Sequence, residues 1–240
     1  MSSEVNPYSP SRDVEPTQAS SDREGDVAEF VPPQRRRMLA IVALAFSILL
    51  AGACLVGDVE LLGLYAVEEE LIDADRETVL LARINGLFVA LMVARLATAP
   101  LFIAWMYRVH CNLPALGHRE LDSKPIWVIV CWFVPIMNLF CPYQVMREIW
   151  VRSAPQAAPS EDSSSAILVI CWWSAWIGMI GLAAWGNFLD RSVTTLEGVV
   201  LATWADIAHL IAIMVAGVLL ICIVTATDLR QLRRYQEALH

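Results

Sequence analysis

Lysine is almost absent from this chain, and acids outnumber basic residues of both kinds. Of its 240 residues, 17 are Lys or Arg and 25 are Asp or Glu, which leaves a net charge of −8. Lys124 is the single lysine. A chain that binds nucleic acid is instead basic as a whole and concentrates Lys and Arg on one face. We therefore expect no nucleic-acid partner.

Paired cysteines and the motifs of common enzymes are missing as well. None of the six cysteines belongs to a CxxC pair or to a Cys/His cluster with zinc spacing, so we expect no metal site and no cofactor. No HExxH or GxSxG motif occurs in the sequence. We therefore expect no catalytic residues, and an enzyme ranks last among the functions that we consider.

Long apolar runs are what the chain has in abundance. Hydrophobic residues make up 57% of it, whereas a soluble domain is nearer half apolar. A bilayer core about 30 Å thick requires about 20 apolar residues per helix, and the strand alternation of an outer-membrane barrel does not occur. Within a bundle domain of residues 35–229, four runs meet this length and predict an all-α, polytopic membrane helix bundle: 38–57, 84–106, 166–188 and 199–227.

The segments around these runs are polar. Residues 1–34 are rich in Ser, Pro and acids, so we predict a disordered acidic tail. Arg35–Arg37 follow it and would orient a retained first span rather than belong to a cleaved signal. Residues 58–83 carry eight acids and predict an amphipathic helix or helical extension outside the membrane. We interpret the acids within 68–73 as a solvated face rather than a cation site. Residues 230–240 predict a basic cytoplasmic end.

Residues 125–150 are apolar enough for lipid but are interrupted by proline. Pro135 and Pro142 each remove a backbone donor and clash with the preceding turn, so a spanning helix is broken here. The unbroken piece, 126–134, is about 13 Å of helix and reaches roughly halfway across the bilayer. Asn138 would then lie near the deepest point, where its amide can satisfy freed backbone groups. We predict a re-entrant segment that returns to the surface it left.

The distribution of basic residues separates this prediction from an alternative with five spans. Lys and Arg in short loops collect in the cytoplasm. With five spans, the loops near the membrane hold seven basic residues on each side, which is no bias. With a re-entrant segment, eleven lie inside and three outside, and both termini are cytoplasmic. Tyr143 then lies at the interface, and Arg147 and Glu148 return to the cytoplasmic surface.

Three ionisable residues lie inside the apolar runs. Arg95 is at the centre of the second run, and Asp206 and His209 lie one turn apart in the last run. A charge at the bilayer centre costs about 2.5–3.5 kcal/mol, so Arg95 should face protein or water. From the depths of these residues along ideal helices, we predict an Arg95–Asp206 ion pair with His209 beside it. The group is either a functional site or a buried pair that fixes helix register.

A set of residues within 105–150 resembles a known family. The pattern is Trp105-x-Tyr107-Arg108, Asn112, Leu116-Gly117, Pro125-x-Trp127 and Trp132-Phe133-x-Pro135-x-x-Asn138-Leu139-x-x-Pro142-Tyr143, followed by Met146, Glu148, Ile149 and Trp150. With Trp172-Trp173-x-x-Trp176, it resembles the uncharacterised bacterial membrane family catalogued as domain of unknown function 4328, over roughly residues 85–225. The resemblance implies a bacterial integral membrane protein of several helices, which we expect in the cytoplasmic (inner) membrane. It implies no activity, substrate or cofactor.

Two functions fit this sequence. A membrane interaction or scaffold protein fits the acidic tail, the linker at 152–165 and the basic end. Its partner, besides the lipid bilayer, would be another membrane protein or a second copy of the chain. A small transporter or channel component would instead use the re-entrant segment and the group formed by Arg95, Asp206 and His209. We take the first as the main prediction and the second as the alternative.

Overall fold

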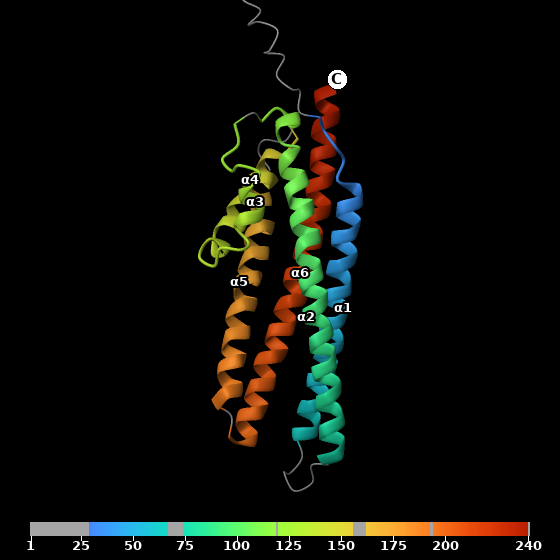
Figure 1. Ribbon diagram of the computed structural model, residues 1–240, viewed down its shortest axis with the longest axis vertical. Helices are drawn as coiled ribbons and strands as arrows, with labels where there is room; N and C mark the ends of the chain where they lie inside the picture. The colour runs from blue at the N-terminus through green and yellow to red at the C-terminus, as the bar shows by residue number, and fades with distance from the viewer. Residues whose placement is uncertain (1–28, 67–73, 119, 156–161, 193, 240) are drawn as a thin grey trace, which may run out of the picture.

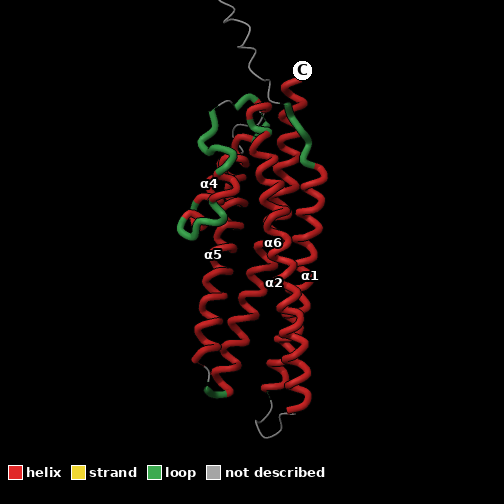
Figure 2. Tube along the Cα trace, viewed as in Figure 1, coloured by secondary structure: helices red, strands yellow, loops and turns green. Residues whose placement is uncertain are grey.

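The computed structural model describes residues 29–66, 74–118, 120–155, 162–192 and 194–239, which are mostly helical (Figure 2). Four long helices carry most of the chain: α1 (Gln34–Tyr65), α2 (Ala74–Cys111), α5 (Asp162–Ser192) and α6 (Leu196–Leu239). Four short elements lie between α2 and α5: η2 (Pro114–Leu116), α3 (Trp127–Val130), η3 (Met137–Leu139) and α4 (Cys141–Arg152). No strand occurs in the described ranges, and the predicted all-α fold is confirmed.

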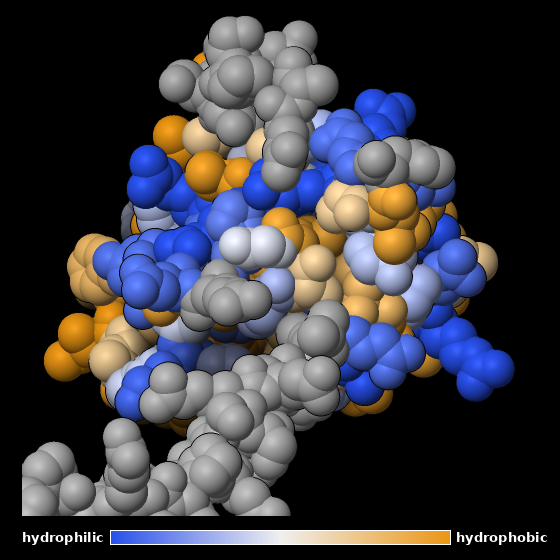
Figure 3. Space-filling view, turned by 90° about the horizontal axis from the view of Figure 1, so that it is seen from above, coloured by the Kyte–Doolittle hydropathy of each residue, from blue (hydrophilic) through white to orange (hydrophobic). Residues whose placement is uncertain are grey.

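The four long helices run alternately up and down one axis (Figure 1). The end of α1, the start of α2, the end of α5 and the start of α6 lie together at one end of the bundle, and the start of α1 and the end of α6 share the other. We call the latter the basic end, because Arg37, Arg108, Arg152 and Arg234 lie there. Hydrophilic side chains gather over much of its visible surface (Figure 3).

All four long helices are candidate membrane spans. Each is long and apolar enough to cross a membrane, and each contains one of the four predicted apolar runs. Leu49 on α1 and Leu96 on α2 each leave 71% of their surface uncovered, as expected for side chains that face lipid. The prediction of four spanning helices is confirmed, and the chain is a multi-pass membrane protein.

The helices extend beyond the apolar runs. α1 continues past Asp58 to Tyr65, and α2 begins at Ala74. The outer segment predicted at 58–83 therefore consists mainly of two helix ends. The hydroxyl of Tyr65 donates a hydrogen bond to Oε1 of Glu77 at 2.7 Å, which ties the two ends together.

Some predicted segments lie outside the described residues. These are residues 1–28 of the predicted disordered tail, the acids within 68–73, and residues 156–161 of the predicted linker. The predictions made for them stay predictions.

The long helices pack in the order α2–α1–α6–α5. α1 lies along both α2 and α6, and α6 lies along α5, whereas the backbones of α2 and α5 lie farther apart. These two helices meet through long side chains such as Phe102 and Trp172, whose ring centroids are 6.2 Å apart. Gly217 permits the close approach of α6 to α1, since a Cβ there would lie 2.9 Å from Cγ1 of Ile48. Near the basic end, α3 packs on α2, and α4 packs on α5. The short elements therefore lie between α2 and α5, the two long helices whose backbones are farther apart.

Residues 125–150 contain no helix of spanning length. The chain enters this broken segment from α2 and leaves it for α5 on the side of the basic end, so the alternative with five spans does not fit (Figure 1). The helix expected over 126–134 is limited to Trp127–Val130, and the backbone then tightens into turns. Pro135 explains this, because it disfavours helical backbone in the residue before it. Entry of the segment into lipid stays a prediction.

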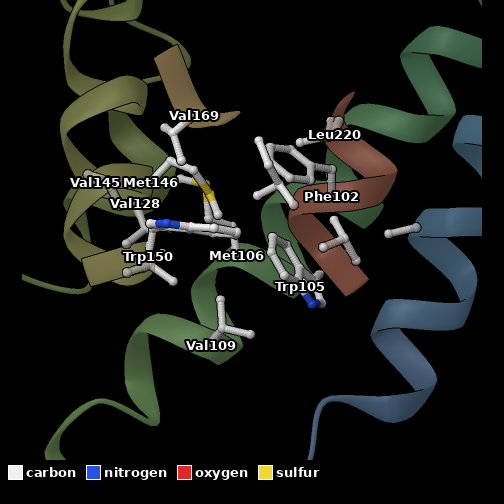
Figure 4. Packing of buried hydrophobic residues seen from close by; sticks show 14 of the residues in the cluster. Phe102, Trp105, Met106, Val109, Val128, Val145, Met146, Trp150, Val169 and Leu220 are labelled. Atoms are coloured by element: carbon white, nitrogen blue, oxygen red, sulfur yellow. The ribbon is translucent and has the colours of Figure 1, made fainter. Parts of the chain in front are cut away.

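The largest buried apolar cluster lies in the half of the bundle next to the basic end (Figure 4). α2 contributes Phe102, Trp105 and Met106, and α4 contributes Met146 and Trp150, all at most 5% exposed. Side chains of α5 and α6 complete the cluster. The broken segment is therefore packed into the core and has a defined position against α2 and α5.

Candidate functional site

A cavity of about 170 Å³ lies inside the bundle, where the broken segment meets the long helices. All four long helices line it, together with Trp132, which follows α3. It lies between α2 and α5, whose backbones do not approach each other closely, and it is partly open. Its lining residues are Leu44, Ser47, Ile48, Arg95, Thr98, Ala99, Phe102, Trp132, Trp172, Trp176, Met179, Ile213, Ala216, Gly217 and Leu220.

Arg95 is the charged residue of this lining. Its side chain reaches from α2 to α5, where Nη2 donates to Sδ of Met179 at 3.0 Å. A guanidinium has five N–H donors, and a thioether is a weak acceptor. Across the described ranges, no hydrogen bond or ion pair supplies this guanidinium with an oxygen acceptor. The cavity therefore holds a half-buried cation without an anionic partner.

The predicted Arg95–Asp206 ion pair is wrong. No ion pair joins the two residues in the described part of the chain, because they lie at different depths. Arg95 is 21 residues beyond the start of α2 at Ala74, and Asp206 is 10 residues beyond the start of α6 at Leu196. Both helices start at the same end, so about 16 Å separates the residues along the axis. The predicted depths were counted from the ends of the apolar runs. α2 begins ten residues before its run, so Arg95 lies deeper in its helix than the run indicates.

His209 approaches the same residue of α5 as Arg95 does. Its Nδ1 lies 3.0 Å from the backbone oxygen of Met179, and the side chain is buried. Arg95 therefore meets Met179 at its sulfur, and His209 meets it at its carbonyl. Sequence reasoning missed Met179, because a methionine inside an apolar run carries no polar signal.

Asp206 lies nearer the end opposite the basic end, beside Asp58. The position that a Cβ on Gly186 would occupy is 3.3 Å from Oδ1 of Asp206, so this glycine of α5 makes room for the carboxylate. Asp58 of α1 is 5% exposed, and its charge interacts with that of Asp206. The sequence predicts Asp58 in the outer segment, and in the structure the neighbouring helices bury its side chain. No cation of the described residues forms an ion pair with either acid.

Aromatic rings connect the broken segment to the cavity. Trp132 packs edge-on against Trp176 and Phe102, with ring centroids 6.2 and 5.9 Å apart. Trp173 stacks on Trp176 at 4.6 Å. The indole Nε1 of Trp132 is buried and has no hydrogen-bond partner, which is uncommon for a buried donor. Two residues of the lining, Arg95 and Trp132, therefore carry donors that lack an oxygen acceptor.

The predicted re-entrant motif is divided between the turns and α4. Pro135 is exposed in a turn, and Pro142 is buried in the first turn of α4, where a helix needs no N–H donor. Tyr143 packs against Trp173 of α5, with ring centroids 6.4 Å apart. The side-chain oxygen of Asn138 is buried and accepts no hydrogen bond. The predicted satisfaction of freed backbone groups by this amide is not observed.

Glu148 is buried, which corrects the prediction that it returns to the surface with Arg147; Arg147 alone is exposed. The carboxylate of Glu148 accepts hydrogen bonds from the backbone N–H groups of Asp122 and Ser123, at 2.7 and 3.2 Å. Oε1 of Glu148 also lies 3.2 Å from Nε of Arg152. Glu148 therefore fastens the loop after η2 to α4.

A second buried polar network joins α1, α2 and α6 at the basic end. Gln231 donates to a backbone carbonyl of α2 at 2.8 Å, and Asn112 donates to Oε1 of Gln231 at 3.3 Å. Nε1 of Trp105 donates to Oδ1 of Asp228 at 3.0 Å, and Arg37 lies 3.6 Å from the other oxygen of that carboxylate. These side chains bond to one another and to the backbone rather than to a cavity, so we assign them a structural role.

Two histidines lie at the basic end, His110 buried and His118 half-buried. His110 is 0% exposed, and its Nε2 is 3.8 Å from Glu148. Burial, followed by the charge of Arg234, lowers the pKa of His118, which keeps this side chain neutral at pH 7. In the ranges that the structure covers, no group of three or more His, Cys, Asp or Glu is arranged to hold a metal ion.

Comparison with known proteins yields one match. The family described as "Domain of unknown function (DUF4328)" matches residues 68–228. No curated protein and no solved structure matches the chain. The matched range contains the broken segment, Arg95, Met179 and His209, whereas α1 and the last turns of α6 lie outside it.

Proposed function

The chain belongs to the DUF4328 family, and because the description of that family assigns no activity, we propose its function from its own geometry. It is a membrane protein that binds a small molecule in the cavity between α2 and α5. The observation that carries this proposal is Arg95, a cation of the lining whose described partner is a thioether alone. A charge at this depth is costly unless a partner neutralises it, and a bound ligand supplies that partner.

A transporter or channel component, the alternative function predicted from the sequence, must also bind its substrate within the membrane, and this proposal concerns that binding. It assigns the binding to the cavity around Arg95, and not to an Arg95–Asp206 pair. Asp206 and Asp58 lie nearer the opposite end of the bundle and outside the cavity lining. The proposal therefore concerns binding within the membrane and assigns no path across it.

Native mass spectrometry of the full chain, extracted in a mild detergent, tests the proposal. We expect a low-mass adduct on the protein that is lost in Ala99→Phe, because Ala99 lines the cavity and a phenylalanine ring would fill it. Ala97→Phe is the matched control, since Ala97 is exposed on the same helix and lies outside the lining. An adduct that is absent from the unsubstituted chain, or that survives both substitutions, would count against binding in this cavity.

A second candidate, the membrane interaction or scaffold role, is favoured by an apolar ledge on the broken segment. The ledge consists of Phe133, Ile136 and Phe140, which are 74%, 76% and 62% exposed. Exposed apolar surface of this kind suits another membrane protein or a second copy of this chain. The same mass spectra distinguish the two functions, because a retained protein partner without a low-mass adduct supports the scaffold and contradicts ligand binding.

We also propose that the basic end faces the cytoplasm of a bacterial inner membrane. Ten described Lys and Arg residues lie toward this end and three toward the other, which is the asymmetry of cytoplasmic loops. A reporter enzyme that is active only outside the cytoplasm, fused after His240, should be inactive. Reporter activity would reverse the orientation.

A further inference from the structure

We propose that the ligand of this cavity is a single-chain amphiphile with a carboxylate head, the chemistry of a long-chain fatty acid. Arg95 binds the carboxylate inside the cavity, and the hydrocarbon tail leaves the bundle between α2 and α5. This inference rests on the proposed function and names the class of molecule that the cavity takes.

The polar groups of the lining that lack a partner are all donors. Arg95 has guanidinium N–H groups beyond the one that meets Met179, and the indole N–H of Trp132 is buried and unpaired. Neither side chain accepts a hydrogen bond. The hydroxyls of Ser47 and Thr98 each donate to a backbone carbonyl of their own helix, at 2.9 and 2.8 Å. A ligand that satisfies this lining must therefore present oxygen acceptors and needs no donor.

The single positive charge selects a monoanion. The lining contains Arg95 and no acid, and a carboxylate presents two oxygens in the plane that matches the guanidinium fork. The cavity volume of about 170 Å³ corresponds to about six water molecules at ~30 Å³ each. That space holds a carboxylate with its first methylene groups, and it is too small for a phosphoglycerol head with two chains.

An apolar stripe on α2 leads from the cavity toward lipid. Met92 and Phe88 lie one and two turns from Arg95, on the same face of the helix and farther from the basic end. They remain 47% and 37% exposed, so the neighbouring helices leave both side chains uncovered. A hydrocarbon tail beside this stripe keeps apolar contacts along its whole length. A small hydrophilic anion would gain nothing from the stripe, which favours an amphiphile.

Tryptophan fluorescence provides the test, because Trp132, Trp172 and Trp176 line the cavity. Dibromostearic acid is the probe, since bromine quenches tryptophan on contact, and its methyl ester is the neutral counterpart. With the full chain in lipid nanodiscs, at a pH where the acid is ionised, we expect saturable quenching by the acid. The ester should give only the gradual quenching of a molecule dissolved in lipid. Equal saturable quenching by both would overturn the carboxylate assignment.

Substitution of the arginine sharpens the test. Arg95→Gln should weaken binding of the acid by about tenfold or more and leave quenching by the ester unchanged. Arg83→Gln is the matched control, because Arg83 is on the same helix, 51% exposed and outside the lining. Arg95→Lys keeps the charge without the bidentate fork, so its affinity for the acid should lie between those of the unsubstituted chain and Arg95→Gln. It provides a second measurement if Arg95→Gln does not fold. Unchanged affinity in a folded Arg95 variant would overturn the inference.

Displacement separates this inference from the proposed function. An adduct that depends on Ala99, but that dibromostearic acid does not displace, would retain the binding function and reject the carboxylate amphiphile. Absence of both the adduct and saturable quenching would reject both proposals. Displacement of the adduct by the acid and not by the ester supports both.

Discussion

Replacing Glu148 by alanine is expected to lower the free energy of unfolding by about 3–5 kcal/mol. The carboxylate is buried and accepts hydrogen bonds from the backbone N–H groups of Asp122 and Ser123. It also pairs with Arg152 at 3.2 Å. The alanine variant leaves two backbone donors and part of a guanidinium without their acceptor in a desolvated place. Equilibrium unfolding in mixed micelles, followed by circular dichroism, measures the change.

The control for Glu148 uses the same arginine. Asp122 pairs with Arg152 at 2.9 Å, but its side chain is 81% exposed. Asp122→Ala should therefore change the free energy of unfolding by less than about 1 kcal/mol. If Glu148→Ala has an effect as small as Asp122→Ala, the assignment of Glu148 as the residue that fastens the loop to α4 fails.

Replacing Trp105 by alanine is expected to be as damaging, with a loss of about 3–5 kcal/mol in the free energy of unfolding. The side chain is 0% exposed, its ring stacks on Phe102 with centroids 5.7 Å apart, and Nε1 donates to Asp228. Alanine removes the ring from the centre of the core and also leaves the carboxylate of Asp228 without this donor. The same unfolding experiment measures the loss.

Two further variants divide the effect of Trp105 into its parts. Trp105→Phe keeps most of the ring but removes the indole N–H, so the loss should fall to about 1–3 kcal/mol. Trp204→Ala removes an indole that is 57% exposed on α6, and it should stay within about 0.5 kcal/mol. Equal losses in Trp105→Ala and Trp204→Ala would contradict the burial of Trp105 in the core.

Both large effects bear on how binding experiments are interpreted. Trp105 stacks on Phe102, and Phe102 packs edge-on against Trp132 in the cavity lining. Loosening of the basic end would therefore move an aromatic wall of the cavity. A loss of ligand in a variant is attributed to the cavity only when its unfolding free energy matches that of the unsubstituted chain.

The four spanning helices were predictable because lipid limits what a backbone can do. Without water, every N–H and C=O of an apolar run must be satisfied within the segment, and a helix does this. The break at Pro135 was predictable for the same reason, since proline removes a donor. The helix ends were not: α1 runs past Asp58 because neighbouring helices cover it, and hydropathy does not record neighbours.

The candidate site was predictable only in part. Arg95 and His209 stand out as ionisable residues in apolar runs, and Trp132 belongs to the pattern that resembles the family. Met179 carries no such signal, and Glu148 was assigned to the surface because it follows the apolar part of the broken segment. In each case the missing information was the identity of the neighbour, which local sequence does not contain.

By itself, the sequence determined that the chain is a polytopic membrane helix bundle with a proline-broken segment, and that Arg95 requires a partner other than lipid. Only the tertiary structure decided what surrounds it. The relative depths of α2 and α6 place Asp206 about 16 Å from Arg95 along the axis, and Arg95 instead meets Met179 and lines a cavity. How far long helices slide past one another depends on side-chain packing along their whole length, so no local pattern of residues specifies it.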